Sequence, residues 1–404
     1  MSLIDSLNDK EIWEAFYEHK TAQGNFRKCD ADDFRRFIDN EEYIDVYMRI
    51  KNSEDLSPPN KILVNKTKAG RKRTVYTFSR EENYVLKLMQ FLLREYDSLF
   101  APNLYSFRKN TGVKKATKDV LAIKKLDASF IYKVDINDYF NSVDIDMLLP
   151  ELEEVLSEDE ELFGFFKRLL TNPIVMWKNE VIEEQKGIMA GVPVASFLAN
   201  FYLREIDWYF YEKGIPYLRY SDDILVFAES ESELRNYISV IKCFLESRKL
   251  RINPEKEIIT KPYEKWTFLG FSYYKGIIDI SEVSFLKLKA KMRRKTNALN
   301  RWAQKKKHPG EYAARAFIKR FNAKLFDNPV DSELTWTRWF FPIINTDATL
   351  KLIDEYMQDC IRFLATGKRT KARYTFRYED IKKLGYRNLV NEYYKFKAED
   401  DENE

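Results

Sequence analysis

Residues 217–227 read Tyr-Leu-Arg-Tyr-Ser-Asp-Asp-Ile-Leu-Val-Phe, and this segment indicates more about the architecture than any other part of the chain. Two short apolar runs flank Ser221, Asp222 and Asp223, which is the pattern of two strands joined by a tight turn. Adjacent aspartates repel each other at such a tip, where Asn-Gly would make the turn with less strain. A positive partner is therefore expected at Asp222 and Asp223.

A third carboxylate, Asp135, ends another apolar segment that is expected to be a buried strand, residues 130–135. The chain has three cysteines and two histidines, and none has the spacing of a zinc site. A hard divalent cation bound through oxygen is the suitable partner, and three carboxylates can hold two Mg²⁺ ions about 4 Å apart. The residues themselves predict metal-assisted nucleotidyl chemistry, with two Mg²⁺ ions as cofactors and Mn²⁺ as a substitute.

The net charge of +4 conceals a strong segregation of charge along the chain. Residues 61–125 carry 16 basic and 5 acidic side chains, residues 126–280 carry 17 and 28, and residues 285–325 carry 14 and 1. Lys and Arg cluster in this way most often for contact with phosphates. The pattern predicts a nucleic acid held on both sides of a carboxylate-rich centre, and the alternative is that the charge runs are only solvated faces.

The order of expected elements predicts the fold class. Residues 71–78 alternate like a hairpin strand, Ser79 and Glu82 are placed as a capping box that opens a helix, and one helix is expected over residues 196–210. A further helix is expected over residues 231–249, and the chain is helical and basic from Ser284 onward. Because strands and helices mix without strict β-α-β alternation, we expect an α+β sheet domain with an appended helical domain.

The 404 residues, 45% of them apolar and 33% charged, predict a globular chain of more than one domain. No apolar run approaches the roughly 18 residues of a membrane span, and the first 16 residues are too acidic and polar for a signal peptide. A cytoplasmic protein without membrane contact is expected.

Five short motifs in order and spacing resemble the palm motifs of reverse transcriptases. They are Val134–Phe140, Gly191 with Ser196–Asn200, Tyr220–Asp223, Leu250–Lys256 and Phe268–Phe271. Upstream, residues 70–73 and 105–108 resemble the fingers motifs of bacterial group II intron-like members. The resemblance implies a right-hand polymerase fold with fingers and palm, made of an antiparallel sheet plus helices, and an α-helical thumb. It also implies RNA-directed DNA polymerase activity, a nucleotidyl transfer that makes cDNA.

The same resemblance assigns roles to single residues of the catalytic centre. Asp135 and Asp222 become the main metal ligands, with Ile136 and Asp223 beside them. Lys256 matches the lysine proposed to protonate the leaving pyrophosphate.

Roles in binding nucleotide and nucleic acid follow from the resemblance in the same way. Phe140 matches the bulky residue whose ring excludes a ribose 2′-hydroxyl, so deoxyribonucleoside triphosphates are the expected substrates. The other nucleotide-binding residues are Arg71, Arg73, Ala190 and Gly191. The nucleic-acid-binding residues are Arg108, the primer-grip residues Phe268, Leu269 and Gly270, and the thumb residues Arg293, Arg294 and Lys295.

One departure narrows the resemblance. Where group II intron-like enzymes have Pro-Gln-Gly, this chain has Met189, Ala190 and Gly191, so the glutamine that would touch the incoming nucleotide is absent. This variant and the segment 366–394 resemble bacterial antiphage-defence reverse transcriptases of the abortive-infection group. The expected domains are an N-terminal helical extension (1–60), fingers (61–125), palm with fingers elements (126–283) and a helical thumb and C-terminal domain (284–404).

Three functions remain open on the sequence. The first is RNA-templated DNA synthesis in phage defence, with a dedicated non-coding RNA as template, a DNA product, and a partner protein or a second copy of the chain as further partners. The second is untemplated or protein-primed nucleotide addition. The third is a non-catalytic nucleic-acid scaffold, against which the three clustered carboxylates argue.

Overall fold

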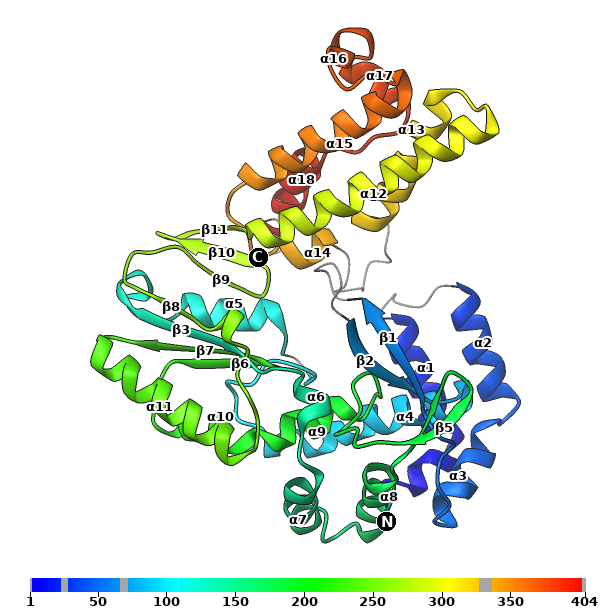
Figure 1. The fold of residues 1–404 in the computed structure, drawn as a ribbon, viewed down its shortest axis with the longest axis vertical. Helices are drawn as coiled ribbons and strands as arrows, with labels where there is room; N and C mark the ends of the chain where they lie inside the picture. Colours follow the sequence, from blue (N-terminus) through cyan, green and yellow to red (C-terminus); the bar gives the residue numbers. More distant parts are fainter. Residues whose placement is uncertain (1, 23–27, 66–71, 110, 327–335, 402–404) are drawn as a thin grey trace. The chain divides into compact units, whose positions relative to one another are not determined.

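The computed structural model describes residues 2–22, 28–65, 72–109, 111–326 and 336–401. These residues pack as two units that divide between Pro262 and Tyr263. Helices and mostly antiparallel strands occur in both units (Figure 1), which confirms the expected α+β class. No helix within the described ranges is long and apolar enough to cross a membrane.

The first unit opens with three helices that share an aromatic core, α1 (Lys10–Ala22), α2 (Lys28–Asp39) and α3 (Tyr43–Lys51). Trp13 is fully buried and stacks on Tyr43, with ring centroids 5.0 Å apart. Phe37 meets the same indole edge-on at 5.4 Å. Offset and edge-to-face contacts of this kind add to the burial of large apolar surfaces and hold the three helices together.

A four-stranded sheet of order β2-β1-β4-β5 follows, formed by β1 (Asn60–Asn65), β2 (Lys72–Thr77), β4 (Ile174–Trp177) and β5 (Glu180–Glu183). The strands β1 and β2 pair antiparallel, with Asn65 opposite Lys72. The predicted capping box is confirmed, because Ser79 Oγ accepts a hydrogen bond from the Glu82 N–H at 3.2 Å and helix α4 (Arg80–Leu92) begins there.

A second sheet carries the segment 217–227 and has the order β6-β7-β3-β8, formed by β3 (Phe130–Asp135), β6 (Tyr217–Tyr220), β7 (Asp223–Ala228) and β8 (Ile258–Thr260). Its neighbouring strands all pair antiparallel. Helix α11 (Glu231–Ser247) packs against β3 and β7. The predicted hairpin is confirmed, since Tyr220 lies opposite Asp223.

The single helix expected over residues 196–210 is wrong. The chain forms α9 (Ala195–Tyr202) and α10 (Arg204–Glu212), and Leu203 between them leaves helical geometry with φ −110° and ψ 9°. Periodicity cannot detect this break, because Leu198, Tyr202 and Ile206 are buried on both sides of it. The remaining helical elements of this unit are η1 (Asp5–Asn8), η2 (Leu93–Leu99), α5 (Val113–Leu121), η3 (Leu126–Ala128), α6 (Tyr139–Ser142), α7 (Ile145–Val155), α8 (Glu160–Thr171) and η4 (Pro254–Lys256).

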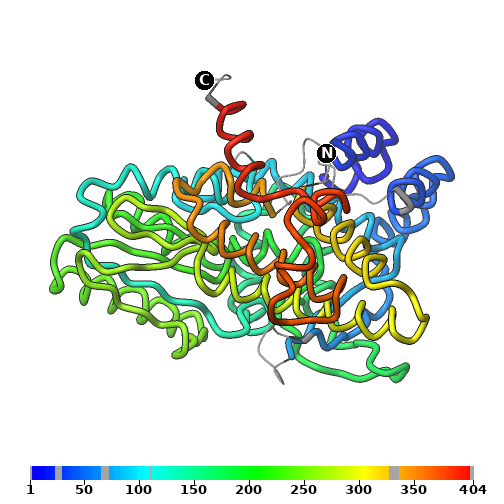
Figure 2. The backbone as a smooth tube through the Cα atoms, turned by 90° about the horizontal axis from the view of Figure 1, so that it is seen from above, coloured from blue at the N-terminus to red at the C-terminus, as the bar shows by residue number. Residues whose placement is uncertain are grey.

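The second unit begins with an antiparallel sheet of order β11-β10-β9, formed by β9 (Trp266–Phe268), β10 (Phe271–Tyr274) and β11 (Ile277–Ile280). Its helices are α12 (Glu282–Lys306), α13 (Gly310–Leu325), α14 (Trp336–Phe340), α15 (Ala348–Thr366), α16 (Ala372–Thr375), α17 (Tyr378–Lys383) and α18 (Leu389–Asp401). Helices α12, α13 and α15 lie side by side (Figure 2) and pack pairwise against one another.

Candidate active site

The predicted carboxylates meet at one end of the β6-β7-β3-β8 sheet. Asp135 ends β3, Asp223 begins β7, and the two residues are paired across the strands. Asp222 precedes Asp223 in the turn, and its carbonyl accepts a hydrogen bond from the Ile136 N–H at 3.1 Å. The antiparallel register therefore brings together three aspartates from two segments that are far apart in the chain.

Both burial and the neighbouring carboxylates change the pKa of Asp222. Burial raises the pKa of Asp222 to about 7, and the charges of Asp135 and Asp223 add to the rise. The charge of Lys256 acts in the opposite direction. Three carboxylates in a site that is largely removed from water favour a bound cation.

Lys256 supplies one such cation. Its ammonium donates a hydrogen bond to Asp135 Oδ2, and the side chain of Asp135 is 4% exposed. Burial alone would lower the pKa of Lys256, but the hydrogen bond to Asp135 and the charges of Asp222 and Asp223 raise it overall. The amine is therefore held protonated beside the carboxylates.

Asn253 fixes the segment that carries Lys256. Its N–H donates to the Asp135 carbonyl at 2.8 Å, and its Nδ2 donates to Asp135 Oδ1 at 3.4 Å. Ile136 and Ile252 form an isolated antiparallel bridge next to it. The predicted motif of residues 250–256 thus lies directly alongside the end of β3.

The donor set fits a divalent cation in its chemistry. Carboxylate oxygens are the ligands of Mg²⁺ and Mn²⁺, and the Lys256 ammonium already occupies one side of Asp135 as a cation. In the described part of the chain, no three His, Cys, Asp or Glu side chains stand close enough to hold an ion as they are placed.

The predicted nucleotide-binding residue Ala190 bonds the side chain of Asn141, which directly follows the predicted Phe140. Asn141 Oδ1 accepts the Ala190 N–H at 3.1 Å, and its Nδ2 donates to the Thr74 carbonyl on β2 at 3.3 Å. The Phe140 ring is half-buried and meets Phe107 edge-on at 6.4 Å. Sequence reasoning missed Asn141, whose only signal was its place directly after Phe140.

Gly191 allows β2 to lie close to this loop. It has φ +101°, and a Cβ added there would stand 3.0 Å from the Tyr76 carbonyl oxygen. The Tyr76 N–H donates to the Ala190 carbonyl at 2.8 Å. Both the backbone conformation and the close strand therefore require glycine at this position.

Of the two arginines predicted to bind the triphosphate, the structure describes one. Arg73 is exposed on β2, paired with Val64 of β1. Arg71 lies outside the described residues.

Arg108 is turned inward, which does not support a role in binding nucleic acid. Its guanidinium makes two hydrogen bonds to the Asp97 carboxylate, at 2.8 and 2.9 Å. Three further bonds reach the carbonyls of Asp97, Ala101 and Leu104. These five bonds occupy the five donors of the side chain, so Arg108 holds the chain before α5 together.

The predicted primer-grip residues form the β9–β10 turn of the second unit. Phe268 is buried, and Leu269 and Gly270 have φ +51° and +92°. The Leu269 carbonyl accepts a hydrogen bond from Trp339 Nε1 at 3.3 Å. The turn is therefore anchored on α14.

The predicted thumb residues lie on α12. Arg293 and Arg294 are exposed and Lys295 is half-buried. The buried face of this helix consists of Leu288, Met292, Thr296, Leu299 and Ala303. Helical spacing places Arg294 on the opposite face, in an exposed basic stripe about 27 Å long. The stripe consists of Lys287, Lys291, Arg294, Arg301 and Lys305.

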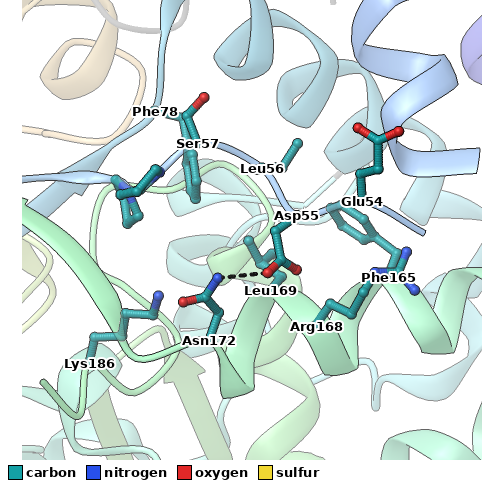
Figure 3. A pocket seen from close by; sticks show the side chains of 12 residues that line it. Glu54, Asp55, Leu56, Ser57, Phe78, Phe165, Arg168, Leu169, Asn172 and Lys186 are labelled. Atoms are coloured by element: carbon teal, nitrogen blue, oxygen red, sulfur yellow. Dashed lines mark hydrogen bonds between the residues drawn. The ribbon is translucent and has the colours of Figure 1, made fainter. Parts of the chain in front are cut away.

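A small cavity of about 20 Å³ lies elsewhere in the first unit, beside α8 (Figure 3). Asp55 accepts a hydrogen bond there from Asn172 Nδ2 at 3.0 Å, and burial lowers the pKa of Lys186 to about 8. The volume suits a single water molecule, and the lining includes none of the predicted site residues.

The sequence is similar to those of known proteins. The family model described as "Reverse transcriptase (RNA-dependent DNA polymerase)" matches residues 64–273. The chain is 24% identical over 230 residues to the retron Ec86 reverse transcriptase of Escherichia coli, and the match covers 55% of this chain and 65% of that relative's length.

Two solved structures are also similar, at low scores. Apo telomerase from Candida tropicalis, truncated from its C-terminal domain, gives a TM-score of 0.43 at 13% identity, over 56% of each chain. Telomerase from Candida albicans, in complex with a fragment of telomeric RNA, gives 0.46 at 12% identity, over 83% of this chain and 62% of that one.

Proposed function

The chain belongs to the reverse transcriptase (RNA-dependent DNA polymerase) family, and on that premise we propose that it is an RNA-directed DNA polymerase acting by two-metal nucleotidyl transfer. The observation that carries the proposal is the pairing of Asp135 with Asp223 across β3 and β7, with Asp222 in the adjoining turn. A scaffold has no use for three clustered carboxylates, of which Asp222 has its pKa raised to about 7 by burial and by the charges of Asp135 and Asp223.

In this proposal Asp135, Asp222 and Asp223 hold two Mg²⁺ ions, with the Ile136 carbonyl next to them and Mn²⁺ as a substitute. The ions, when bound, stabilise the charge on the attacking and leaving oxygens of an in-line phosphoryl transfer. Lys256 keeps a proton beside the same carboxylates and would give it to the leaving pyrophosphate. The Lys256 ammonium has to move away from Asp135 before it can donate this proton to the pyrophosphate.

The substrates proposed are deoxyribonucleoside triphosphates. Arg73, exposed on β2, and Arg71 would bind the triphosphate through charge-assisted hydrogen bonds. The half-buried Phe140 ring would exclude a 2′-hydroxyl, and the backbone of Ala190 and Gly191 would form the rest of the nucleotide site. The loop is held for this task by Asn141 and Tyr76.

The proposed partners are an RNA template and the DNA product. The basic stripe of α12 would contact the phosphates of the duplex without reading its sequence, and the turn of Phe268, Leu269 and Gly270 would contact the primer. The division into fingers (61–125), palm (126–283) and thumb (284–404) is part of the same proposal.

We further propose that the protein serves in bacterial antiphage defence, with a dedicated non-coding RNA as template. The support is the Met189-Ala190-Gly191 variant and the resemblance of residues 366–394 to defence reverse transcriptases. Phage plating efficiency on cells carrying the wild-type gene or Asp222→Ala, expressed equally, tests this role. Equal plating on both strains would contradict it.

The activity is tested by sequencing both the nucleic acid that copurifies with the chain and the DNA made from it. A product complementary to the bound RNA is expected, and it should be absent from Asp222→Ala. A product without a template, or a ribonucleotide product, would contradict RNA-directed DNA synthesis. Exposed Asp127→Asn, before β3, serves as a control that should leave the product unchanged.

A further inference from the structure

A fully buried arginine stands three residues before Asp222. Arg219 on β6 has a side-chain exposure of 0%, as does its partner Asp207 on α10. Arg219 Nε donates to Asp207 Oδ1 at 2.8 Å, and Nη2 donates to Oδ2 at 2.5 Å. Removing both charges from water is costly, and apolar side chains of similar size would often serve stability as well.

The remaining donors of Arg219 reach beyond this ion pair. Its Nη1 donates to the carbonyl of Ser221 at 3.2 Å, and its Nη2 also donates to the carbonyl of Asn200 on α9 at 3.2 Å. Two helices and the turn that carries Asp222 are thus joined through one guanidinium. A lysine could not make these bonds, because it lacks the planar fork of donors.

The backbone N–H of Ser221 is held by another buried residue, Ser106. The Ser221 N–H donates to Ser106 Oγ at 2.8 Å, and Ser106 Oγ donates to Asn200 Oδ1 at 3.3 Å. Asn200 Nδ2 in turn donates to the Ser106 carbonyl at 2.8 Å. Ser106 and Asn200 are both buried, so these bonds are made away from water.

The residue between these two anchors has a strained backbone. Ser221 has φ +59°, in the left-handed region that a residue with a side chain seldom adopts. Such a conformation persists only when its surroundings fix it. Its N–H and its carbonyl are both fixed here, and Asp222 is the next residue.

We propose that Arg219, Asp207, Ser106 and Asn200 act as positioning residues that hold Ser221 in its left-handed conformation and thereby aim the Asp222 carboxylate at the metal ions. The inference rests on the proposed function, since it assigns Asp222 to metal binding. None of the four side chains touches the substrate in this proposal. They act only through the turn.

Two variants test the positioning role, and each removes a different anchor of the turn. Ser106→Ala deletes one anchor of the turn, whereas Arg219→Met with Asp207→Leu removes the other and leaves no unpaired buried charge. Tyr217→Phe is the matched control, because the Tyr217 hydroxyl donates to Asp207 Oδ1 at 3.0 Å within the same network but does not bond the turn. Each variant is measured for melting temperature, for incorporation at varied nucleotide, and for Mn²⁺ binding by electron paramagnetic resonance of the protein alone.

Displacement of a reacting group by about 1 Å can lower a rate about 100-fold, so we expect kcat to fall about 10- to 100-fold in both variants. KM for nucleotide should stay within about twofold, because the residues proposed to bind the nucleotide are unchanged in these variants. Mn²⁺ affinity should fall with kcat, while Tyr217→Phe keeps both. Retention of kcat and Mn²⁺ affinity by Ser106→Ala and the double variant, at the level of Tyr217→Phe, would overturn the proposal.

A second-site change separates positioning from general loss of stability. Glycine adopts a positive φ without strain, so Ser221→Gly should restore part of the kcat and Mn²⁺ affinity that Ser106→Ala removes. A purely structural role for Ser106 predicts no such rescue. Failure of the wild-type protein to incorporate nucleotide would refute the proposed function, whereas the Mn²⁺ measurements would still decide whether the four residues position Asp222.

Discussion

The Lys256 ammonium donates a hydrogen bond to Oδ2 of Asp135, a residue 121 positions earlier in the chain. This contact places a positive charge against the carboxylates at the end of β3, and the same charge lowers the pKa of Asp222 against the effects of burial and of Asp135. In the proposed mechanism, Lys256 competes with a divalent cation for Asp135 and also donates a proton to the leaving group.

Lys256→Met should separate these two effects. Loss of the ammonium makes the site more negative, so Mn²⁺ should bind about fivefold more tightly. Incorporation should nevertheless fall at least about tenfold, because the variant has no proton donor at this position. Mn²⁺ titration and steady-state incorporation check both expectations, with exposed Lys265→Met as the control. Weaker Mn²⁺ binding in Lys256→Met would show that Lys256 does not compete with the cation.

Asp222→Asn should abolish incorporation, by at least about 1,000-fold, while the fold remains intact. The pKa of about 7 for Asp222 lies above the usual value near 4, so the folded chain binds this proton more tightly than the unfolded chain does. Its contribution to wild-type stability therefore declines as pH rises from about 4 to 7.

The asparagine variant lacks this decline. Its melting temperature relative to wild type, measured with EDTA, should rise between pH 5 and 7 and level off above pH 7. A constant difference across this range would show that Asp222 is not the group with the raised pKa.

Local patterns predicted the parts of this site that local chemistry determines. The hairpin of residues 217–227 and the capping box at Ser79 follow from alternation and side-chain type within a few residues. The Arg219–Asp207 pair could not be predicted, because nothing in a single sequence marks which buried polar residues bond one another. Arg108 was assigned to nucleic acid because residues 105–108 resemble a fingers motif, yet its donors are used within the fold.

Phe140→Ala should raise the incorporation of ribonucleotides relative to deoxyribonucleotides. The half-buried ring is expected to occupy the space of a 2′-hydroxyl, and its removal would open that space. Competition between the two nucleotide types at equal concentration measures the ratio. Phe140→Tyr keeps the ring and should keep the wild-type ratio. An unchanged ratio in the alanine variant would assign Phe140 to packing alone.

Gly310→Ala should destabilise the second unit by about 2 kcal/mol, the usual cost of overpacking. A Cβ at this position would stand 2.5 Å from the backbone oxygens of Leu364 and Ala365, which cannot move without disturbing α15. Gly164→Ala on α8 is the control, because its nearest neighbour is the flexible Arg168 guanidinium at 3.5 Å. Thermal unfolding of both variants gives the comparison. Equal melting temperatures would show that α13 can shift away from α15.

Neutralising the basic stripe of α12 should weaken binding to RNA–DNA duplexes of unrelated sequence to a similar extent. In the triple variant of Lys287, Arg294 and Arg301 to Gln, the slope of log affinity against log salt should become shallower by up to about three, roughly 0.9 for each phosphate that the helix no longer neutralises. Arg293→Gln and Lys295→Gln, both off the stripe, should have smaller effects, and Arg235→Gln on α11 is the distant control.

Arg73→Ala should instead keep duplex binding and raise KM for nucleotide, because its proposed partner is the triphosphate. Filter binding across salt concentrations, together with incorporation at varied nucleotide, distinguishes the two roles. Normal duplex binding by the stripe variant would contradict the role of α12 in holding the duplex. Loss of affinity for duplex rather than nucleotide in Arg73→Ala would contradict the role of Arg73 in binding the triphosphate.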